Sequence, residues 1–112
     1  MGQGTDLDER LRGILGELRH RFERLYGERL VEMVLYGSRA RGDGDPCSDT
    51  DVLVVLRGPV RPGDEIERTG EIVADISLRF GEVITCVFMD QERFAHRNGP
   101  FLRNVRKEGV AL

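Results

Sequence analysis

The run Leu30–Tyr36 places apolar residues at nearly every position instead of at alternate positions. A strand of this kind is covered on both faces, because successive side chains point to opposite faces of a sheet. Two later runs, Val52–Leu56 and Glu82–Met89, are also rich in β-branched and apolar residues and are predicted to be strands. The chain is therefore expected to form a sheet with helices packed against it.

Helices are predicted between and after these strands. In residues 7–25, Leu, Ile and Phe recur at steps of three and four with charged residues between them, as in an amphipathic helix that packs on a sheet. Gly27 is a suitable stop for this helix, and Asp90 is a suitable N-cap for a later one. The predicted helices are residues 7–25, 64–80, 91–97 and 101–108.

Length and charge restrict the class of protein. The 112 residues are predicted to form one domain, residues 1–112. The 17 basic and 20 acidic residues give a net charge of −3, so bulk charge does not favour nucleic acid as a partner. No apolar run approaches the ~20 residues of a membrane span, and the first residues lack the pattern of a signal peptide. Cys47 and Cys86 have no metal-binding motif around them, which favours free thiols in a reducing cytoplasm.

Two polar motifs stand where the first predicted strand ends and the second begins. Asp49 and Asp51 are two positions apart, so in a strand they project from the same face. Two unpaired carboxylates at this spacing repel each other, and a divalent cation such as Mg²⁺ between them removes the conflict. Gly37 lets the backbone approach a phosphate, and Ser38 adds a hydroxyl donor. Together the motifs predict a site for a metal-bound nucleoside triphosphate.

Each motif alone is weak evidence, because glycine-serine turns and acidic strand starts are common on solvated surfaces. Their combination beside two apolar strands is more specific. The sequence lacks the Gly-x-x-x-x-Gly-Lys-Ser/Thr pattern of a Walker phosphate loop, and its acidic residues do not have the spacing of an EF-hand.

The segments Leu35–Gly42 and Ser48–Val54 resemble the signature of the DNA polymerase β-type nucleotidyltransferase superfamily, and most closely its minimal nucleotidyltransferases. The resemblance implies an α/β (α+β) fold, a small mixed β-sheet with helices packed mainly on one face. It implies that Asp49 and Asp51 are catalytic and hold Mg²⁺. It also implies transfer of a nucleoside monophosphate from a nucleoside triphosphate, ATP favoured, to an acceptor hydroxyl. The nucleotide contacts it implies are Gly37, Ser38, Arg39, Arg41 and Ser48.

The same resemblance implies a third carboxylate on the next strand, where it helps to hold the metal that activates the acceptor hydroxyl. The interior of the predicted strand Glu82–Met89 contains no acidic residue. The positions where the carboxylate is expected are Thr85, Cys86 and Val87. The acidic residues left as candidates to replace it are Glu82, Asp90 and Asp75.

Two functions follow, and the sequence leaves both open. The first is a nucleotidyltransferase, with a protein partner among its acceptors. The second is a catalytically weak or inactive nucleotide-binding adaptor or antitoxin that acts by binding its partner, and the missing carboxylate favours it. The resemblance implies a small helical partner of the HEPN class in a toxin–antitoxin module, and a homodimer is compatible with the small core. A nucleic-acid contact rests only on basic residues near the C-terminal end, for which a solvated helix face is the simpler explanation.

Overall fold

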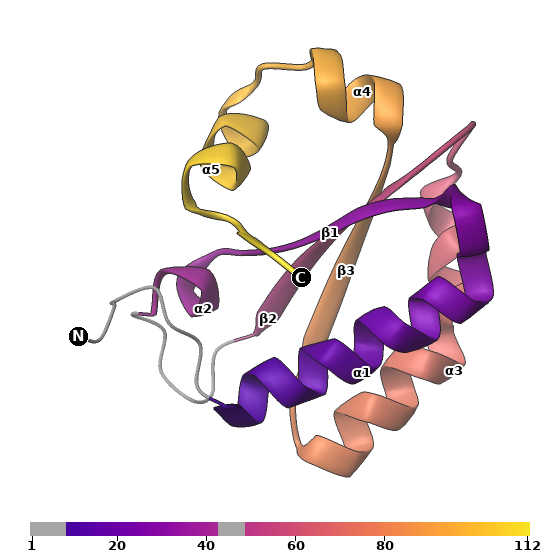
Figure 1. Cartoon of the computed structure of the whole chain (residues 1–112), viewed down its shortest axis with the longest axis vertical. Coiled ribbons are helices and arrows are strands. Elements are labelled where there is room, and N and C mark those ends of the chain that lie inside the picture. The colour runs from indigo at the N-terminus through magenta and orange to yellow at the C-terminus, as the bar shows by residue number, and fades with distance from the viewer. Residues whose placement is uncertain (1–8, 43–48) are drawn as a thin grey trace.

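The computed structural model describes residues 9–42 and 49–112, and this part of the chain forms a four-stranded mixed sheet with the order β3-β2-β1-β4 (Figure 1). β1 (Leu30–Tyr36) pairs antiparallel with β2 (Thr50–Leu56), and β2 pairs parallel with β3 (Ile84–Asp90). β4 (Val110–Ala111) extends the sheet beyond β1 by a short antiparallel pairing. The strands that adjoin the two predicted motifs, β1 and β2, are therefore neighbours.

The two long helices cover one face of the sheet. α1 (Glu9–Tyr26) and α3 (Pro62–Phe80) lie side by side there, and α3 is the crossover that a parallel β2–β3 pair requires (Figure 1). The periodic apolar residues of α1 are buried as the sequence pattern predicts. The main core cluster is drawn from Leu18, Phe22, Met33, Leu35, Val52, Val54, Ile76 and Phe88, with others around them.

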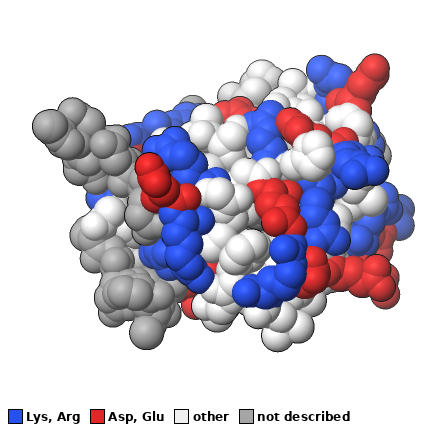
Figure 2. Space-filling model, turned by 60° about the horizontal axis from the view of Figure 1, so that its bottom comes forward, with Lys and Arg blue, Asp and Glu red and all other residues white. Residues whose placement is uncertain are grey.

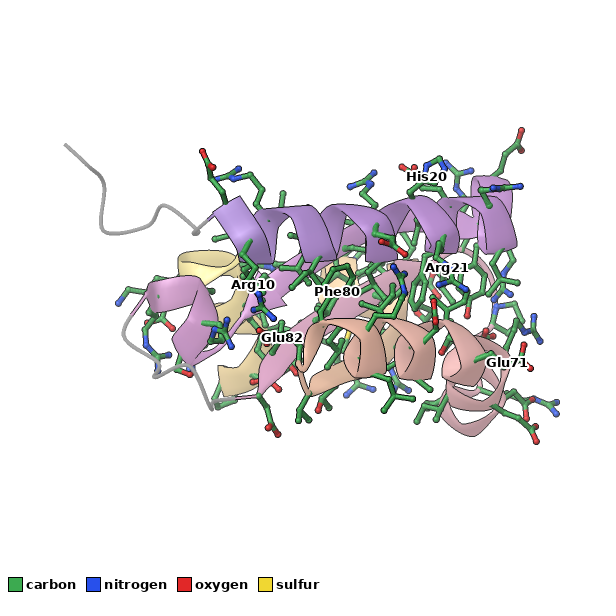
Figure 3. The ribbon with its side chains drawn as sticks, turned by 90° about the horizontal axis from the view of Figure 1, so that it is seen from below. Arg10, His20, Arg21, Glu71, Phe80 and Glu82 are labelled. Carbon is green, nitrogen blue, oxygen red and sulfur yellow. The ribbon has the colours of Figure 1, made fainter. Side chains whose placement is uncertain are left out.

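Ion pairs join the exposed flanks of these two helices. Arg21 of α1, labelled in Figure 3, lies 2.6 Å from the carboxylate of Asp75 on α3. Arg79 of α3 contacts both Asp75 and Glu17. Basic and acidic side chains therefore alternate over this face (Figure 2). Exposed pairs of this kind each add little stability, but they place opposite charges next to each other between α1 and α3.

The shorter helices cover the other face. Leu102 and Val105 of α5 (Pro100–Glu108) pack on Val34, Leu53 and Val55, and α4 (Gln91–His96) adds Phe94 to the same cluster. The expected fold class, a mixed sheet with its main helices on one face, is confirmed. Within the described residues, no helix is both long and apolar enough to cross a membrane.

The element boundaries differ from the sequence prediction at a few places. β1 has the predicted bounds, and α1 ends one residue before Gly27, which has φ +58° and opens a short 3₁₀ turn, Gly27–Arg29. The third strand begins at Ile84, so Glu82 stands before it and not within it. Asp90 caps α4 as predicted, accepting a hydrogen bond from the N–H of Arg93 at 2.6 Å. β4 was not expected, because its two residues are too short to show a strand pattern.

Candidate active site

Antiparallel pairing brings the two predicted motifs together. Tyr36, the last residue of β1, is the register partner of Asp51 near the start of β2, and Gly37 follows directly. Gly37 has φ +82°, and a Cβ built on it would stand 2.8 Å from Oδ2 of Asp51. The carboxylate of Asp51 thus lies against the backbone of the glycine turn, in a position that only glycine leaves open.

A substitution at Gly37 tests this contact. Gly37→Ala is expected to lower the free energy of unfolding by about 1–3 kcal/mol, because the backbone conformation is strained for alanine and the new Cβ collides with Asp51. Thermal or urea unfolding measures the loss. Gly70→Ala on α3 is the control, because a Cβ added there would meet nothing within 4 Å and alanine favours a helix. An equal effect of both substitutions would contradict the proposed contact.

A single helical turn follows the glycine. α2 (Ser38–Arg41) begins with the N–H groups of Ala40 and Arg41 donating to the carbonyl of Gly37 at 3.1 and 3.2 Å, and Gly42 ends it with φ +80°. Ala40 is buried and fixes the turn to the core. The first N–H groups of α2 therefore stand at the end of β1, next to Asp51, an arrangement that suits an anion.

The carboxylate pair has the electrostatics of a cation site. Burial raises the pKa of Asp51, and the neighbouring charge of Asp49 raises it further. Asp49 itself is exposed. A cation between the two would remove the repulsion, and oxygen ligands of this kind suit Mg²⁺. The donor set fits one metal ion shared with phosphate oxygens.

The register of β3 identifies the position of the missing carboxylate. Thr85 pairs with Asp51 across the parallel β2–β3 ladder, and it is exposed. Paired residues share a face, so Thr85 stands beside Asp51, whereas Cys86 points to the opposite face and packs against the main core. Burial raises the pKa of the Cys86 thiol to about 12, which makes it a poor nucleophile. Of the three positions that the sequence left open, Thr85 is the one beside Asp51.

Glu82 is occupied by structural contacts. Its side chain is only 5% exposed and accepts hydrogen bonds from Arg10 at 2.7 Å, from Arg39 at 3.2 Å and from the hydroxyl of Thr50 at 3.3 Å. Figure 3 shows Arg10 and Glu82 lying together near Phe80, at the end of α3. Burial alone would raise the pKa of Glu82, but Arg10 and Arg39 hold it below its usual range. The carboxylate of Glu82 therefore links α1 and α2 to the first residue of β2.

The other two candidates lie away from Asp51. Asp90 is paired with Leu56, at the far end of the β2–β3 ladder, and Asp75 lies on α3 in contact with Arg21 and Arg79. Among residues 9–42 and 49–112, no three His, Cys, Asp or Glu side chains are placed to hold one metal ion. The described residues thus supply two carboxylates at this site.

Removal of the Glu82 carboxylate is expected to destabilise the protein. Glu82→Ala leaves Arg39, whose side chain is 10% exposed, without this partner, so we expect the free energy of unfolding to fall by about 2–4 kcal/mol. Asp75→Ala removes an exposed pair and should have a much smaller effect. The pKa of Glu82 is lower in the folded chain than in the unfolded chain. Its contribution to the free energy of unfolding is therefore present at neutral pH and is lost as the pH falls through the folded-state pKa. Urea unfolding at pH 7 and at acid pH measures both effects, and equal losses in the two variants would contradict the role of Glu82.

Two of the predicted nucleotide contacts, both arginines of α2, form ion pairs with glutamates. Arg39 pairs with Glu82, and the guanidinium of Arg41 lies 3.2 Å from the carboxylate of Glu108 on α5. Ser48 lies outside the described residues.

Tyr36 is a neighbour of Asp51 that was not predicted as a site residue. Burial and the charge of Asp51 raise the pKa of Tyr36, so its phenol stays protonated. Its position beside Asp51 depends on strand register, which no local motif encodes.

A glycine turn that suits phosphate, next to a carboxylate pair on a mixed sheet, defines a class of nucleotide-handling protein, and comparison with known proteins specifies the family. Residues 12–111 match the family described as "Nucleotidyltransferase domain". The chain belongs to this family, whose reaction is the transfer of a nucleoside monophosphate from a nucleoside triphosphate.

Two relatives from Methanocaldococcus jannaschii are similar over most of the chain. One, named "Putative protein adenylyltransferase MJ0604", is 34% identical over 89 residues, which cover 78% of this chain and 82% of the relative. The other, named "Putative protein adenylyltransferase MJ1305", is 31% identical over 86 residues, which cover 75% of this chain and 58% of that relative. This chain therefore matches less than two thirds of the second relative.

A solved structure shares the fold. The crystal structure titled as that of "a putative nucleotidyltransferase" from Sulfolobus solfataricus superposes with a TM-score of 0.53, covering 99% of this chain and 89% of that chain at 22% identity. At this identity the likeness establishes the arrangement of helices and strands, and it agrees with the family assignment.

Proposed function

We propose that this nucleotidyltransferase domain binds Mg²⁺–ATP and transfers AMP to a hydroxyl group of a protein. The observation that carries the proposal is the contact between the glycine turn and Asp51, which joins a phosphate site to a carboxylate pair. Asp49 and Asp51 would hold Mg²⁺, which would neutralise phosphate charge as pyrophosphate leaves. The choice of AMP and of a protein acceptor is supported by the names of the two relatives.

Each residue of the proposed site has its own role in binding the nucleotide. In this proposal, Gly37 and the N–H groups that follow it bind the terminal phosphates, and Ser38 donates a hydroxyl hydrogen bond. Arg39, which is paired with Glu82, would contribute through the backbone of α2, and Arg41 would contact the nucleotide. Ser48, which is outside the described residues, stays a predicted nucleotide contact. Tyr36 remains a neutral phenol beside Asp51, able to donate a hydrogen bond there.

A second function, binding without efficient transfer, is favoured by Thr85. The proposed site has two carboxylates, and the position beside Asp51 on the next strand is a threonine. An acceptor hydroxyl without a metal or base beside it keeps a pKa far above neutral, so transfer would be slow. In that case the protein acts as a nucleotide-binding adaptor or antitoxin.

The partner and setting belong to the same proposal. We place the reaction in the cytoplasm and take the acceptor to be a small helical protein of the HEPN class, with the pair forming a toxin–antitoxin module. Residues 1–112 act as one domain in this scheme, alone or as a homodimer.

Labelling distinguishes the two functions. The purified protein is incubated with Mg²⁺ and ATP labelled at the α-phosphate, with and without a co-expressed helical partner, and denatured products are separated by mass. Covalent label on the partner supports transfer. A nucleotide-dependent rise in melting temperature without label supports the adaptor, because a ligand that binds only the folded state stabilises it. Absence of both with every common nucleotide would contradict nucleotide binding itself.

A further inference from the structure

A hollow lined by arginine residues lies at the end of the sheet remote from the carboxylate pair. Its volume is about 580 Å³, and its lining residues lie where β2 ends and α3 begins. Figure 1 shows these two elements. Asp51 stands near the start of β2 and Arg57 just after its end, so strand geometry separates them by ~20 Å. We call this feature the arginine hollow, after its lining residues Arg29, Arg57, Arg61 and Arg68, which share it with Asp64 and Glu65.

The charge of the arginine hollow is opposite to that of the whole chain. Four arginines against two carboxylates leave two positive charges there, while the full chain carries −3. Guanidinium groups are the donors best matched to phosphate, because they present several N–H groups in one plane. The local balance therefore suits a phosphate dianion.

A buried carboxylate organises the floor of the hollow. Glu65 is 3% exposed and accepts a hydrogen bond from the hydroxyl of Tyr26 at 2.6 Å. Arg29 and Arg68 each lie 3.6 Å from its oxygens. The carboxylate of Glu65 thus contacts Tyr26, Arg29 and Arg68, and it holds the two guanidinium groups in position in the absence of a ligand.

Backbone carbonyls hold two of the arginines without cancelling their charge. Arg29 donates to the carbonyls of Arg57 and Pro59, each at 3.2 Å, and Arg57 donates to the carbonyl of Glu28 at 3.0 Å. Arg61 makes no side-chain hydrogen bond or ion pair with the residues that the structure describes, and it is exposed. Arg61 can therefore turn toward a ligand at no cost in existing contacts.

The surroundings favour a compact ligand over an extended one. On the other side of the Gly58–Pro59 turn, a neighbouring hollow is lined by Asp90 and Glu92 and by no basic residue among those that the structure describes. A nucleic-acid strand that continued past the turn would meet this negative surface. Within the described part of the chain, the arginine hollow also offers no exposed aromatic ring on which a base would stack, since Tyr26 is buried beneath it.

We propose that the arginine hollow is a second anion site, which binds a phosphate group of a small molecule independently of the nucleotide site. The phosphate is either free, as in inorganic pyrophosphate, or the tail of a nucleotide. Arg61 and Arg57 supply the net positive charge, and Arg29 and Arg68 are aligned by Glu65.

A titration without metal tests the proposal. ¹⁵N-labelled protein is titrated with sodium pyrophosphate, and separately with AMP, in EDTA at low salt. Saturable shifts of the Gly58 and Gly63 amide signals are expected with pyrophosphate. A comparable response to AMP assigns the site to nucleotide tails as well as to free phosphate. Shifts confined to Gly37 and Ser38, or no saturation, would overturn the proposal.

Matched variants locate the binding. Arg61→Gln should weaken pyrophosphate binding about tenfold, the effect of losing one charge-assisted hydrogen bond. Arg103→Gln on α5, which removes an exposed arginine elsewhere, should change the pyrophosphate affinity less than twofold. Asp51→Asn should leave it unchanged, which separates this site from the proposed function. Equal weakening by Arg61→Gln and Arg103→Gln would show unspecific charge attraction, and tighter binding of a single-stranded RNA than of pyrophosphate would also overturn the proposal.

Discussion

Thr85→Asp is expected to increase nucleotidyl transfer by about two orders of magnitude, the lower end of the range for a positioned acid–base group, because a third carboxylate would help to hold the metal at the acceptor hydroxyl. Thr85 pairs with Asp51 and shares its face, so an aspartate there places a third carboxylate at the acceptor side of the site. The initial rate of label transfer from ATP to the partner measures the gain. A second readout comes from stability: the added charge should destabilise the protein at neutral pH without metal, and Mg²⁺ should reverse the loss.

Two variants serve as controls for this gain. Thr85→Asn has nearly the same shape as the aspartate without its charge and should leave transfer at the wild-type level. Val87→Asp adds a carboxylate on the same face, two residues further along β3. Val87 packs there against the cluster that contains Leu102 and Val105 of α5, so this substitution should only destabilise the protein. Robust wild-type transfer that Thr85→Asp leaves unchanged would mean that the reaction needs no third carboxylate. A gain equally large in Thr85→Asn would assign the effect to removal of the threonine.

Asp51→Asn is expected to abolish the stabilisation by Mg²⁺–ATP. With nucleotide at about 100 times its Kd, the wild-type melting temperature should rise by about 10 °C, and the variant should show no rise. Differential scanning calorimetry measures both. Glu71→Gln, an exposed change on α3, is the control that should retain the full shift (Figure 3). A full shift in Asp51→Asn would refute the assignment of Asp51 to the metal.

The same variant has a defined pH dependence without nucleotide. Burial and Asp49 raise the pKa of Asp51 in the folded chain above its ordinary value of 3.8, so the folded state binds this proton more tightly than the unfolded state. Ionised Asp51 therefore destabilises the fold as the pH rises from the ordinary pKa of the carboxyl group through its raised pKa in the folded chain. Asp51→Asn should match or exceed wild-type stability at pH 7 and lose this advantage at pH 4. Strong destabilisation at pH 7 would mean that Asp51 is a structural residue.

Local patterns were sufficient to predict much of the fold. The unbroken apolar run of β1 and the three- and four-residue periodicity of α1 each specify one element, because burial on a sheet requires those spacings. Gly27 and Asp90 were recognised as boundary residues because their chemistry acts over a single turn. The start of β3 was misplaced because Glu82 adjoins an apolar run, and sequence alone does not reveal its contact with Arg10, which lies 72 positions away.

The candidate site shows the same division between local and distant information. The adjacency of Gly37 and Asp51 was predicted from motifs at the ends of two successive strands, and pairing of those strands brings them together. The choice among Thr85, Cys86 and Val87 required the register of β3 against β2, which no local motif encodes. The arginine hollow was not predicted for a similar reason, since its arginines come from separate loops and from α3.

The central position of β2 has a consequence for how the two halves of the site move. Residues Val52–Leu56 are fully buried and paired on both sides, so their amide protons should be among the slowest in the chain to exchange with solvent. α2 is one turn long, and Ala40 is its one buried residue. The carboxylate half of the site is thus carried by the most protected strand, whereas the phosphate half lies on a single helical turn outside the sheet, held by Ala40 and by the side-chain pairs Arg39–Glu82 and Arg41–Glu108. Any opening that admits or releases a nucleotide should therefore begin at α2, and its amides should exchange orders of magnitude faster than those of β2.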